Sequence, residues 1–344
     1  MKKIVLVIKD AYSYAGTENI CNFMSECFGE NHDVTIYSIQ GGDKPFYPFT
    51  CVTKIESFHR ENNPIRAIAR RIHQEQFEAI FIISMGRLSV MFALHSLLMR
   101  RSKKGRFYAC EHIAINSFNR AVRLLKFLTL HFYDKVIVLT DKDHRQFTSW
   151  KINSLTIPNP VRFKNYERCY RTRQMLAVGR LDHQKGFDLM LPIWQDFVSK
   201  NPGWTLVIAG KGEQRHALEG QVRKLKISGS VMLTGKVTNI DDYYRDSDIV
   251  LMTSRYEGLP LVLLEAKSWS LPVIAYDCPT GPREIITPGE DGFLIAPNDQ
   301  QHFVAKLNQL ARDDALFYTM CRKTRTTCQR FDESVIKQAW LSLV

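Results

Sequence analysis

The sequence predicts an α/β protein made of two doubly wound domains in tandem. Its 344 residues suit two domains of about 100–200 residues each. Short apolar runs alternate with helical segments along the chain, which favours parallel sheets covered by helices on both faces. A polar, proline-containing segment at residues 158–168 separates two such series and is typical of a linker. The ordinary apolar content of 45% excludes a disordered or fibrous chain.

The first series of elements precedes the linker. Each expected strand is a short, largely apolar run, and each expected helix has its apolar residues spaced to line one face. Strands are expected at residues 4–8, 34–38, 79–83, 107–110, 135–139 and 154–157, and helices at 19–28, 65–76 and 88–100. A loop containing Gly16 joins the first strand to the first helix.

The second series repeats this alternation after the linker. Strands are expected at residues 175–178, 205–209, 231–233, 249–253, 273–275 and 292–294, and helices at 188–199, 216–224, 240–245 and 261–268. The expected domains are therefore residues 1–165 and 166–325. In doubly wound domains ligands bind outside the carboxyl ends of the strands, so a ligand cleft is expected between the two domains.

Charge is distributed unevenly between the two halves. The net charge is +12, and residues 1–165 carry 24 basic and 14 acidic side chains against 23 and 21 in the remainder. A basic half predicts an anionic partner, such as nucleic acid, a phospholipid surface or a polyphosphate, although solubility alone would also account for it. The eight cysteines form no C-x-x-C pair, and no export signal is evident, so we expect reduced thiols in the cytoplasm.

The densest cluster of chemically informative residues is SRYEGLPLVLLEA, at residues 254–266. It follows an expected buried strand and opens a helix whose first-turn amides can hold an anion. Glu257 lies in the loop and Glu265 lies about a turn and a half inside the helix. Each carboxylate can accept two hydroxyl hydrogen bonds, which suits a sugar and a ribose. It is equally plausible that Glu257 caps the helix and Glu265 is an ordinary surface residue.

Three further loops follow expected strands. Arg180 and Lys185 bracket a turn, and two cations beside a helix start suit a diphosphate, although a solvated basic turn has the same composition. Gly16 and Gly210 lie in loops where glycine allows close backbone approach to a ligand; tight turns explain them equally well. Neither loop matches a complete phosphate-binding fingerprint.

His112 follows Glu111 at the end of the expected strand 107–110. The carboxyl end of a parallel strand is where catalytic groups gather, so His112 is a candidate catalytic residue. A single histidine more often has a structural role, which is the alternative for this position.

Residues 119–135 form a predicted amphipathic helix with basic and apolar side chains interleaved. Such a helix suits a membrane interface, and a core-packed helix with a solvated basic face fits equally well. A basic run at residues 100–106 lies nearby in the sequence. The candidate membrane or acceptor contacts are Arg120, Arg123, Lys126, Phe127 and Leu130.

Taken together, these motifs resemble the retaining family 4 glycosyltransferases of the GT-B fold. The resemblance rests on Arg180-x4-Lys185, on the Glu257-x7-Glu265 pair, and on CPTGPREII, GEDGFLI and IPNPV at residues 278–286, 289–295 and 157–161. It covers essentially the whole chain and is stronger in the second half. It implies two Rossmann-like domains facing across a cleft, with a C-terminal helix at about 326–344 returning to the first, acceptor-binding domain.

The resemblance also implies roles for individual residues. Arg180 and Lys185 would hold the donor diphosphate with help from the loop of Gly16 and Thr17, and Glu265 would bind the ribose. His112 would meet the donor sugar near the reacting centre. The donor sugar would be held by Glu257 and the amides of Gly258, Leu259, Pro260 and Leu261, with Gly210 beside the base or ribose. Proline has no amide hydrogen, so Pro260 contributes shape rather than a donor.

The implied activity is transfer of glucose, galactose or one of their N-acetyl forms from a UDP-sugar to a lipid-linked saccharide. The acceptor would be carried on undecaprenyl diphosphate or on lipid A-core, in O-antigen, capsule or lipopolysaccharide assembly. Attack on the face of the departing phosphate would give retention and an α-linkage. The enzyme would act at the inner face of the cytoplasmic membrane, with no cofactor and no nucleic-acid partner.

No metal is expected, because the cations at Arg180 and Lys185 would stabilise the leaving diphosphate. Two Asp-x-Asp pairs, Asp141/Asp143 and Asp246/Asp248, are better explained by helix caps and turns. Two alternatives to a transferase remain open at this point: a UDP-sugar 2-epimerase on the same scaffold and a non-enzymatic nucleic-acid-binding protein.

Overall fold

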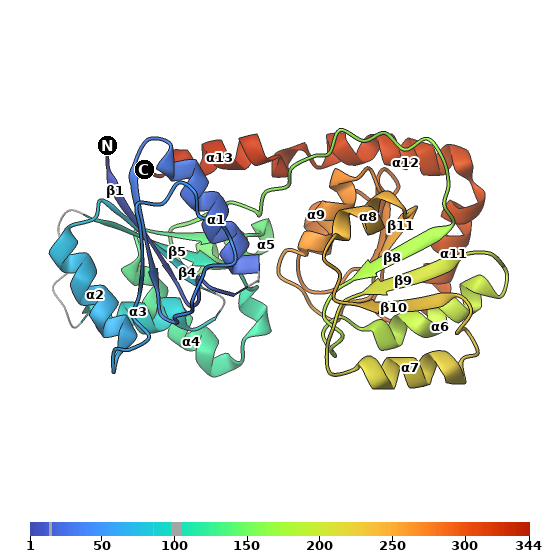
Figure 1. Ribbon diagram of the computed structural model, residues 1–344, viewed down its shortest axis with the longest axis horizontal. Coiled ribbons are helices and arrows are strands. Elements are labelled where there is room, and N and C mark those ends of the chain that lie inside the picture. Colours follow the sequence, from blue (N-terminus) through green and yellow to red (C-terminus); the bar gives the residue numbers. More distant parts are fainter. Residues whose placement is uncertain (14–15, 85, 98–104) are drawn as a thin grey trace. The chain divides into compact units, whose positions relative to one another are not determined.

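The computed structural model describes residues 1–13, 16–84, 86–97 and 105–344, and these form two compact units (Figure 1). Unit 1 comprises Met1–Asn159 and Ser334–Val344, and unit 2 comprises Pro160–Glu333. Each unit contains one parallel sheet with helices between its strands. In the described part of the chain, none of the helices has both the length and the apolarity needed to cross a bilayer.

The sheet of unit 1 has the strand order β3-β2-β1-β4-β5-β6-β7. The order reverses between β1 and β4, and the loops at such a reversal are the usual ligand sites of this architecture. The strands are β1 (Lys3–Ile8), β2 (Asp33–Ser38), β3 (Lys54–Ser57), β4 (Ala79–Ser84), β5 (Arg106–Glu111), β6 (Lys135–Val138) and β7 (Ser154–Thr156). The helices are α1 (Gly16–Gly29), α2 (Pro64–Glu75), α3 (Leu88–Leu97), α4 (Arg120–Thr129), α5 (Asp141–Ser149) and α13 (Glu333–Leu341).

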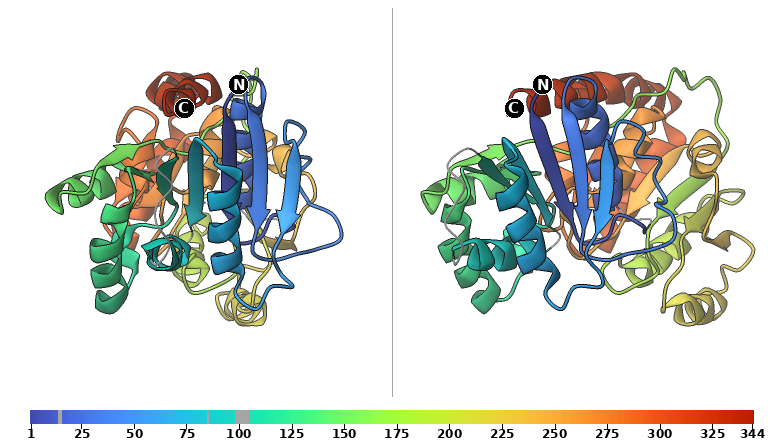
Figure 2. Two further views of the ribbon diagram at one scale, coloured as in Figure 1. Left: turned by 90° about the vertical axis from the view of Figure 1, so that its left-hand side faces the viewer. Right: turned by 60° about the vertical axis from the view of Figure 1, so that its left-hand side comes forward.

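Both faces of this sheet are buried, as the apolar strand sequences predict. In β1, Ile4 and Leu6 belong to a core shared with α1 and α13, whereas Val5 and Val7 belong to a second core shared with α2 and α3. Successive side chains of a strand point to opposite faces, so a strand covered on both sides is apolar throughout. Figure 2 shows the helices lying against the strands of this sheet.

The end of the chain packs on unit 1. The Trp340 ring meets Phe81 edge-on with 6.0 Å between centroids, and the Tyr108 hydroxyl donates to the Leu343 carbonyl at 2.7 Å. Unit 2 extends to Glu333 and so includes α12 (Asp314–Thr327). The return to unit 1 therefore lies later in the chain than the expected residue 326.

The sheet of unit 2 has the order β10-β9-β8-β11-β12-β13, with its reversal between β8 and β11. The strands are β8 (Gln174–Val178), β9 (Thr205–Ala209), β10 (Val231–Gly235), β11 (Ile249–Met252), β12 (Val273–Tyr276) and β13 (Gly292–Ile295). The remaining helices are α6 (Phe187–Val198), α7 (Arg215–Lys224), α8 (Ile240–Arg245), α9 (Leu261–Ser268), α10 (Pro282–Ile285) and α11 (Gln300–Arg312).

Two elements differ from the sequence-based expectation, and part of a third lies outside the described residues. The edge strand β3 was not predicted, because its residues KIES are mostly polar and partly exposed and pair with β2 at the edge of the sheet. The helix expected at 119–135 ends at Thr129, and a 3-10 turn follows at Leu130–Phe132. The end of the helix expected at 88–100, and most of the basic run at 100–106, lie outside the described residues.

Candidate active site

The loops after β8 and β11 flank the strand-order reversal of unit 2 and are tied together. The Thr253 hydroxyl donates to the Gly186 carbonyl at 2.8 Å, and the Arg255 amide donates to the Gln184 carbonyl at 2.8 Å. Gly186 adopts φ +65°, and a Cβ there would lie 2.3 Å from the Thr253 carbonyl oxygen, so glycine is needed for this approach. These contacts hold the two predicted donor segments side by side.

Lys185 and Glu257 meet across this pair of loops. The Lys185 Nζ lies 2.7 Å from Glu257 Oε1, and the two side chains are only 16% and 7% exposed. A largely buried cation paired with a carboxylate is a strong, directional contact, and both groups also have capacity for further hydrogen bonds. The structure thus brings together two residues that are far apart in the sequence and that the motifs had assigned to one ligand.

Arg180 is placed differently. Its side chain is 71% exposed and contacts Asp182 at 3.2 Å and Gln184 at 3.2 Å, both in its own loop. An exposed ion pair of this kind is weak and easily exchanged for another anion. Arg180 is therefore available to a ligand at the loop surface, whereas Lys185 is held in place.

The helix α9 begins directly after the Glu257 loop. Gly258 and Leu259 lead to Pro260, which occupies the N-cap position without a side-chain hydrogen bond to the helix, and Leu261 is the first helical residue. The first-turn amides therefore have no capping side chain, and a helix start of this kind attracts anions.

Glu265 lies in the second turn of α9 and is partly buried. The Tyr244 hydroxyl, from α8, donates to Glu265 Oε2 at 2.6 Å. Burial raises the pKa of the Glu265 carboxyl above its ordinary value. Tyr244 was not singled out from the sequence, because an aromatic residue inside an apolar pattern gives no sign that its hydroxyl meets a carboxylate.

Gly210 begins the loop after β9, beside the loop after β8. A Cβ at Gly210 would lie 1.8 Å from the Gly179 carbonyl oxygen, so any larger residue would force these two loops apart. Backbone packing thus explains the glycine, which allows the loops after β8 and β9 to lie close together.

In unit 1, Gly16 and Thr17 start the helix that follows β1, at the strand-order reversal of that sheet. Gly16 is exposed, and the buried Thr17 hydroxyl donates to Glu18 Oε2 at 2.8 Å. Ser13 donates to the other Glu18 oxygen at 3.2 Å. The sequence did not single out Glu18, since a glutamate in a first helical turn is ordinary.

His112 directly follows β5 and is only 9% exposed. Its Nε2 has no hydrogen-bond partner among the residues that the structure describes. Burial lowers the pKa of His112 to about 4, so the imidazole is neutral at neutral pH. A neutral, buried ring with an unused nitrogen suits contact with an uncharged polar group such as a sugar hydroxyl.

This lowered pKa predicts a loss of stability in acid. Between about pH 6.5 and pH 4 the unfolded chain binds a proton at His112 that the folded chain does not bind, so the free energy of unfolding falls as the pH falls. The effect is at most about 3 kcal/mol. Unfolding curves of wild type and His112→Asn across this pH range should differ in slope, with the variant less sensitive to acid. If the unfolding free energies of the two proteins fall with pH at the same slope, the lowered pKa of His112 is contradicted.

The predicted membrane contacts on α4 need correction. Lys126 and Leu130 are fully buried, so neither can touch a membrane surface. Arg120 and Phe127 are exposed, and Arg123 is partly buried. The amphipathic pattern was correctly recognised, but Lys126 was assigned to the surface because it is charged, and the structure places it in the interior.

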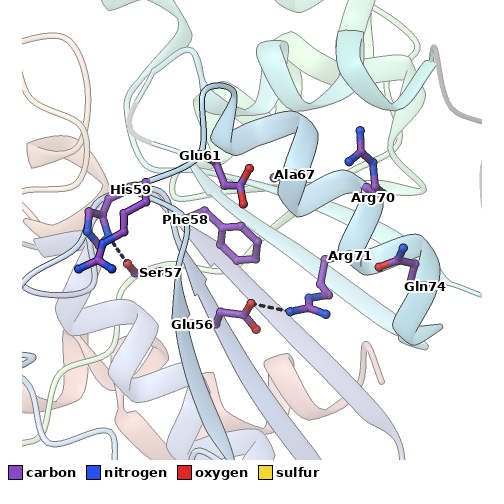
Figure 3. Close-up of a pocket in the computed structure, with 10 residues that line it drawn as sticks. Glu56, Ser57, Phe58, His59, Glu61, Ala67, Arg70, Arg71 and Gln74 are labelled. Atoms are coloured by element: carbon purple, nitrogen blue, oxygen red, sulfur yellow. Dashed lines mark hydrogen bonds and ion pairs between the residues drawn. The ribbon is translucent and has the colours of Figure 1, made fainter.

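A hollow of about 390 Å³ lies between the end of β3 and α2. Figure 3 shows Phe58 at its centre and the ion pair of Glu56 with Arg71, 2.8 Å apart, at one side. None of the predicted site residues lines it, so it is not part of the candidate site.

The second aspartate of each Asp-x-Asp pair accepts hydrogen bonds from backbone amides that are distant in the sequence. The Asp248 carboxylate accepts hydrogen bonds from the backbone amides of Thr172 and Arg173, and the side chain of Asp143 accepts one from the Ile115 amide. Within residues 1–13, 16–84, 86–97 and 105–344, no group of three or more histidine, cysteine or carboxylate side chains is arranged to hold a metal ion.

Comparison with known proteins identifies the relatives of this chain. The family model described as "Glycosyl transferases group 1" matches residues 163–330. The chain is 34% identical to the amylovoran biosynthesis glycosyltransferase AmsD of Erwinia amylovora, over 99% of both chains. It is 25% identical to a Campylobacter jejuni α-1,4-N-acetyl-D-galactosaminyltransferase whose name specifies an undecaprenol-linked saccharide, over 100% of this chain and 98% of that one. Anabaena HepE, solved with UDP-glucose, superposes with a TM-score of 0.82 at 18% identity, covering 100% and 99% of the two chains. The fold expected from the sequence, GT-B with two Rossmann-like domains, is confirmed.

Proposed function

The chain belongs to the glycosyl transferases group 1 family, and on this basis we propose that it is a retaining hexosyltransferase that uses a UDP-sugar donor. The sugar would be glucose, galactose or an N-acetylated form of either, and the new bond would be an α-glycoside. The observation that carries the donor assignment is the contact of Lys185 with Glu257 at the strand-order reversal of unit 2. Relatives named as glycosyltransferases favour transfer over epimerisation or nucleic-acid binding.

In this proposal the donor diphosphate lies between Lys185, Arg180 and the start of α9. Lys185 exchanges part of its contact with Glu257 for a phosphate oxygen, which leaves the Glu257 carboxylate to accept hydroxyl hydrogen bonds from the sugar. Glu265 accepts from the ribose, and the loops of Gly16 and Gly210 border the nucleotide. UDP is present in a solved complex of HepE, which is similar in fold.

The reaction follows from where charge develops. As the anomeric C–O bond breaks, the sugar gains oxocarbenium character and negative charge grows on the departing UDP. Lys185, Arg180 and the α9 amides stabilise that charge and take the place of a divalent metal. The acceptor hydroxyl attacks on the face that the phosphate leaves, and its proton passes to the departing phosphate oxygen. Attack on that face retains the anomeric configuration. The neutral His112 ring contacts the donor sugar near the reacting carbon.

We further propose a lipid-linked saccharide as the acceptor, on undecaprenyl diphosphate or lipid A-core. The names of AmsD and of the Campylobacter enzyme place those proteins in polysaccharide and undecaprenol-linked saccharide synthesis. With a lipid-linked acceptor, the enzyme would act at the inner face of the cytoplasmic membrane.

The exposed side of α4 supports this location. Leu124 and Leu128 are 60% and 61% exposed, and Met91 and Leu94 of the neighbouring α3 are also exposed. No acidic residue occurs between residues 112 and 133, whereas Arg120 is exposed there. An apolar patch with a basic border is the composition that binds an anionic lipid surface.

The function is tested by incubating the purified protein with a panel of UDP- and GDP-sugars in excess EDTA, with and without an undecaprenyl-diphosphate-linked sugar. Release of nucleotide from one UDP-hexose, increased by the acceptor, is expected, and NMR of the product should show an α-anomer. If no sugar in the panel releases nucleotide and the protein does not bind UDP, the proposal is contradicted. Activity only without EDTA would show that a metal takes part.

Glu265→Ala should weaken UDP binding by about 10- to 100-fold, because a charge-assisted hydrogen bond to the ribose would be lost. Isothermal titration of UDP measures this directly. Glu257→Ala should mainly lower turnover and serves as the comparison, since its carboxylate faces the sugar. Equal UDP affinity in Glu265→Ala and wild type would remove the ribose assignment.

Leu124→Ser with Leu128→Ser should reduce binding to anionic phospholipid vesicles at least tenfold, because two exposed apolar side chains no longer enter the interface. Vesicle co-sedimentation at two salt concentrations measures the effect. Met232→Ser, which removes a 59% exposed apolar side chain of unit 2, is the control. If all three proteins bind vesicles alike, α4 is not the contact.

A further inference from the structure

Helix α4 carries a lysine on its buried side. The Lys126 side chain is 0% exposed and its Nζ lies 2.5 Å from Glu111 Oε2, where the Glu111 side chain is 3% exposed. Removing two charges from water costs several kcal/mol per ion, and an apolar pair of similar size is often at least as stable. Stability alone therefore does not account for this pair.

Both oxygens of Glu111 are held. The Ser89 hydroxyl, from α3, donates to Glu111 Oε1 at 2.5 Å, while Lys126 donates to Oε2. Tyr133 in turn donates its hydroxyl to the Ser89 carbonyl at 2.7 Å. We call Ser89, Glu111 and Lys126 the Glu111 cluster. It fixes the carboxyl end of β5 to two helices at once.

His112 is the next residue after Glu111. Its amide donates to the Ser84 carbonyl at 3.0 Å, and the Ser84 hydroxyl accepts from the Ser89 amide at 3.3 Å. The backbone of His112 is thus tied to the end of β4 on one side and follows the fully anchored Glu111 on the other. The ring that this backbone carries is buried, and its Nε2 has no hydrogen-bond partner in the described part of the chain.

We propose that the Glu111 cluster is a positioning device for His112: it fixes the end of β5 so that the imidazole meets the donor sugar in one orientation. Ser89, Glu111 and Lys126 are positioning residues and do not touch the substrate. The contact with the donor sugar and its kinetic consequence rest on the proposed function, whereas the fixing of the His112 backbone and ring does not. A displacement of about 1 Å at a reacting group can cost about 100-fold in rate.

The main test variant replaces both charges at once, Glu111→Met with Lys126→Met, because a single substitution would leave one buried charge unpaired and could unfold unit 1. The double variant should melt at or above the wild-type temperature and bind UDP within twofold of wild type. Its kcat should fall by about 30- to 100-fold. Ser89→Ala removes the hydroxyl that donates to Glu111 at 2.5 Å and accepts from Lys126 at 3.4 Å, and it removes neither charge. Its kcat should fall by about 3- to 10-fold, and this variant decides the question if the double variant does not fold.

A His112→Ala background separates positioning from a general structural effect. If the cluster acts through His112, adding the double substitution to His112→Ala should lower kcat by less than twofold further. A full 30-fold further loss would show that the cluster acts elsewhere. Wild-type kcat in a folded double variant would also overturn the inference.

A measurement that does not depend on activity distinguishes failure of this inference from failure of the proposed function. In protein labelled with ¹⁵N-histidine, the His112 ring signals are assigned by their loss in His112→Ala. They should be narrow in wild type and shifted or broadened in the double variant and in Ser89→Ala. If wild type transfers no sugar, the proposed function fails, and the His112 ring signals alone test the positioning role. Unchanged ring signals in the variants would overturn that role.

Discussion

Lys185→Ala is expected to lower kcat/KM for sugar transfer by about 30- to 1,000-fold. This corresponds to about 2–4 kcal/mol of lost transition-state stabilisation, as is typical when a preorganised charge at a developing anion is removed. Lys185 is preorganised here because Glu257 holds its Nζ at 2.7 Å in a site where the lysine side chain is only 16% exposed. Initial-rate measurements with the donor identified by the panel give the effect directly.

Two comparisons sharpen this result. Arg180→Ala should lose activity in the same range, because the second cation shares the leaving-group charge, even though its side chain is 71% exposed. Lys224→Ala removes an exposed lysine at the end of α7 and should leave the rate unchanged. A near wild-type rate for Lys185→Ala would exclude its role at the diphosphate.

Asp291→Ala should destabilise unit 2 by about 3–5 kcal/mol, the cost of leaving a buried charge without its partner. The Lys267 Nζ lies 2.5 Å from Asp291 Oδ1, and both side chains are 0% exposed. The same carboxylate accepts the Thr287 amide at 2.9 Å. Burial lowers the pKa of Lys267, so the variant partly recovers by releasing the lysine proton.

Urea unfolding followed by the fluorescence of Trp194 and Trp204, both in the core of unit 2, measures this loss. Asp291→Ala combined with Lys267→Met removes both charges and should regain most of the stability. A loss below about 1 kcal/mol in the single variant would show that Lys267 does not remain there as an unpaired buried charge. Because Lys267 belongs to α9, the single variant should also weaken UDP binding through movement of that helix.

Most elements were predictable because the signals are local. A strand buried on both faces is a continuous apolar run, and β1, β4 and β11 each stand out for that reason. The polar edge strand β3 carries no such run and becomes a strand only by pairing with β2. The loops that bear Lys185, Glu257 and His112 were likewise recognisable, since each directly follows a predicted strand.

The sequence could not show which side chains meet. Glu257 was assigned to a sugar and Lys185 to a diphosphate, but their mutual contact joins residues 72 positions apart. Glu265 was recognised as a motif residue, whereas the Tyr244 hydroxyl that holds it comes from another helix. Pairings of this kind depend on how elements are ordered in the sheet, which no local pattern specifies.

The sequence by itself determined the two α/β domains, the family and the residues that form the donor motifs, because periodicity, glycine placement and motif spacing are properties of neighbouring residues. Only the tertiary structure decided which face of α4 is buried. Its pattern of leucines and basic residues fits a solvated face or an interior one, and the choice depends on a partner for Lys126. That partner, Glu111, lies on β5, and the pairing turns Lys126 inward while the leucines remain exposed. The burial of a charge depends on a long-range contact, so it is decided by the fold and not by the local sequence.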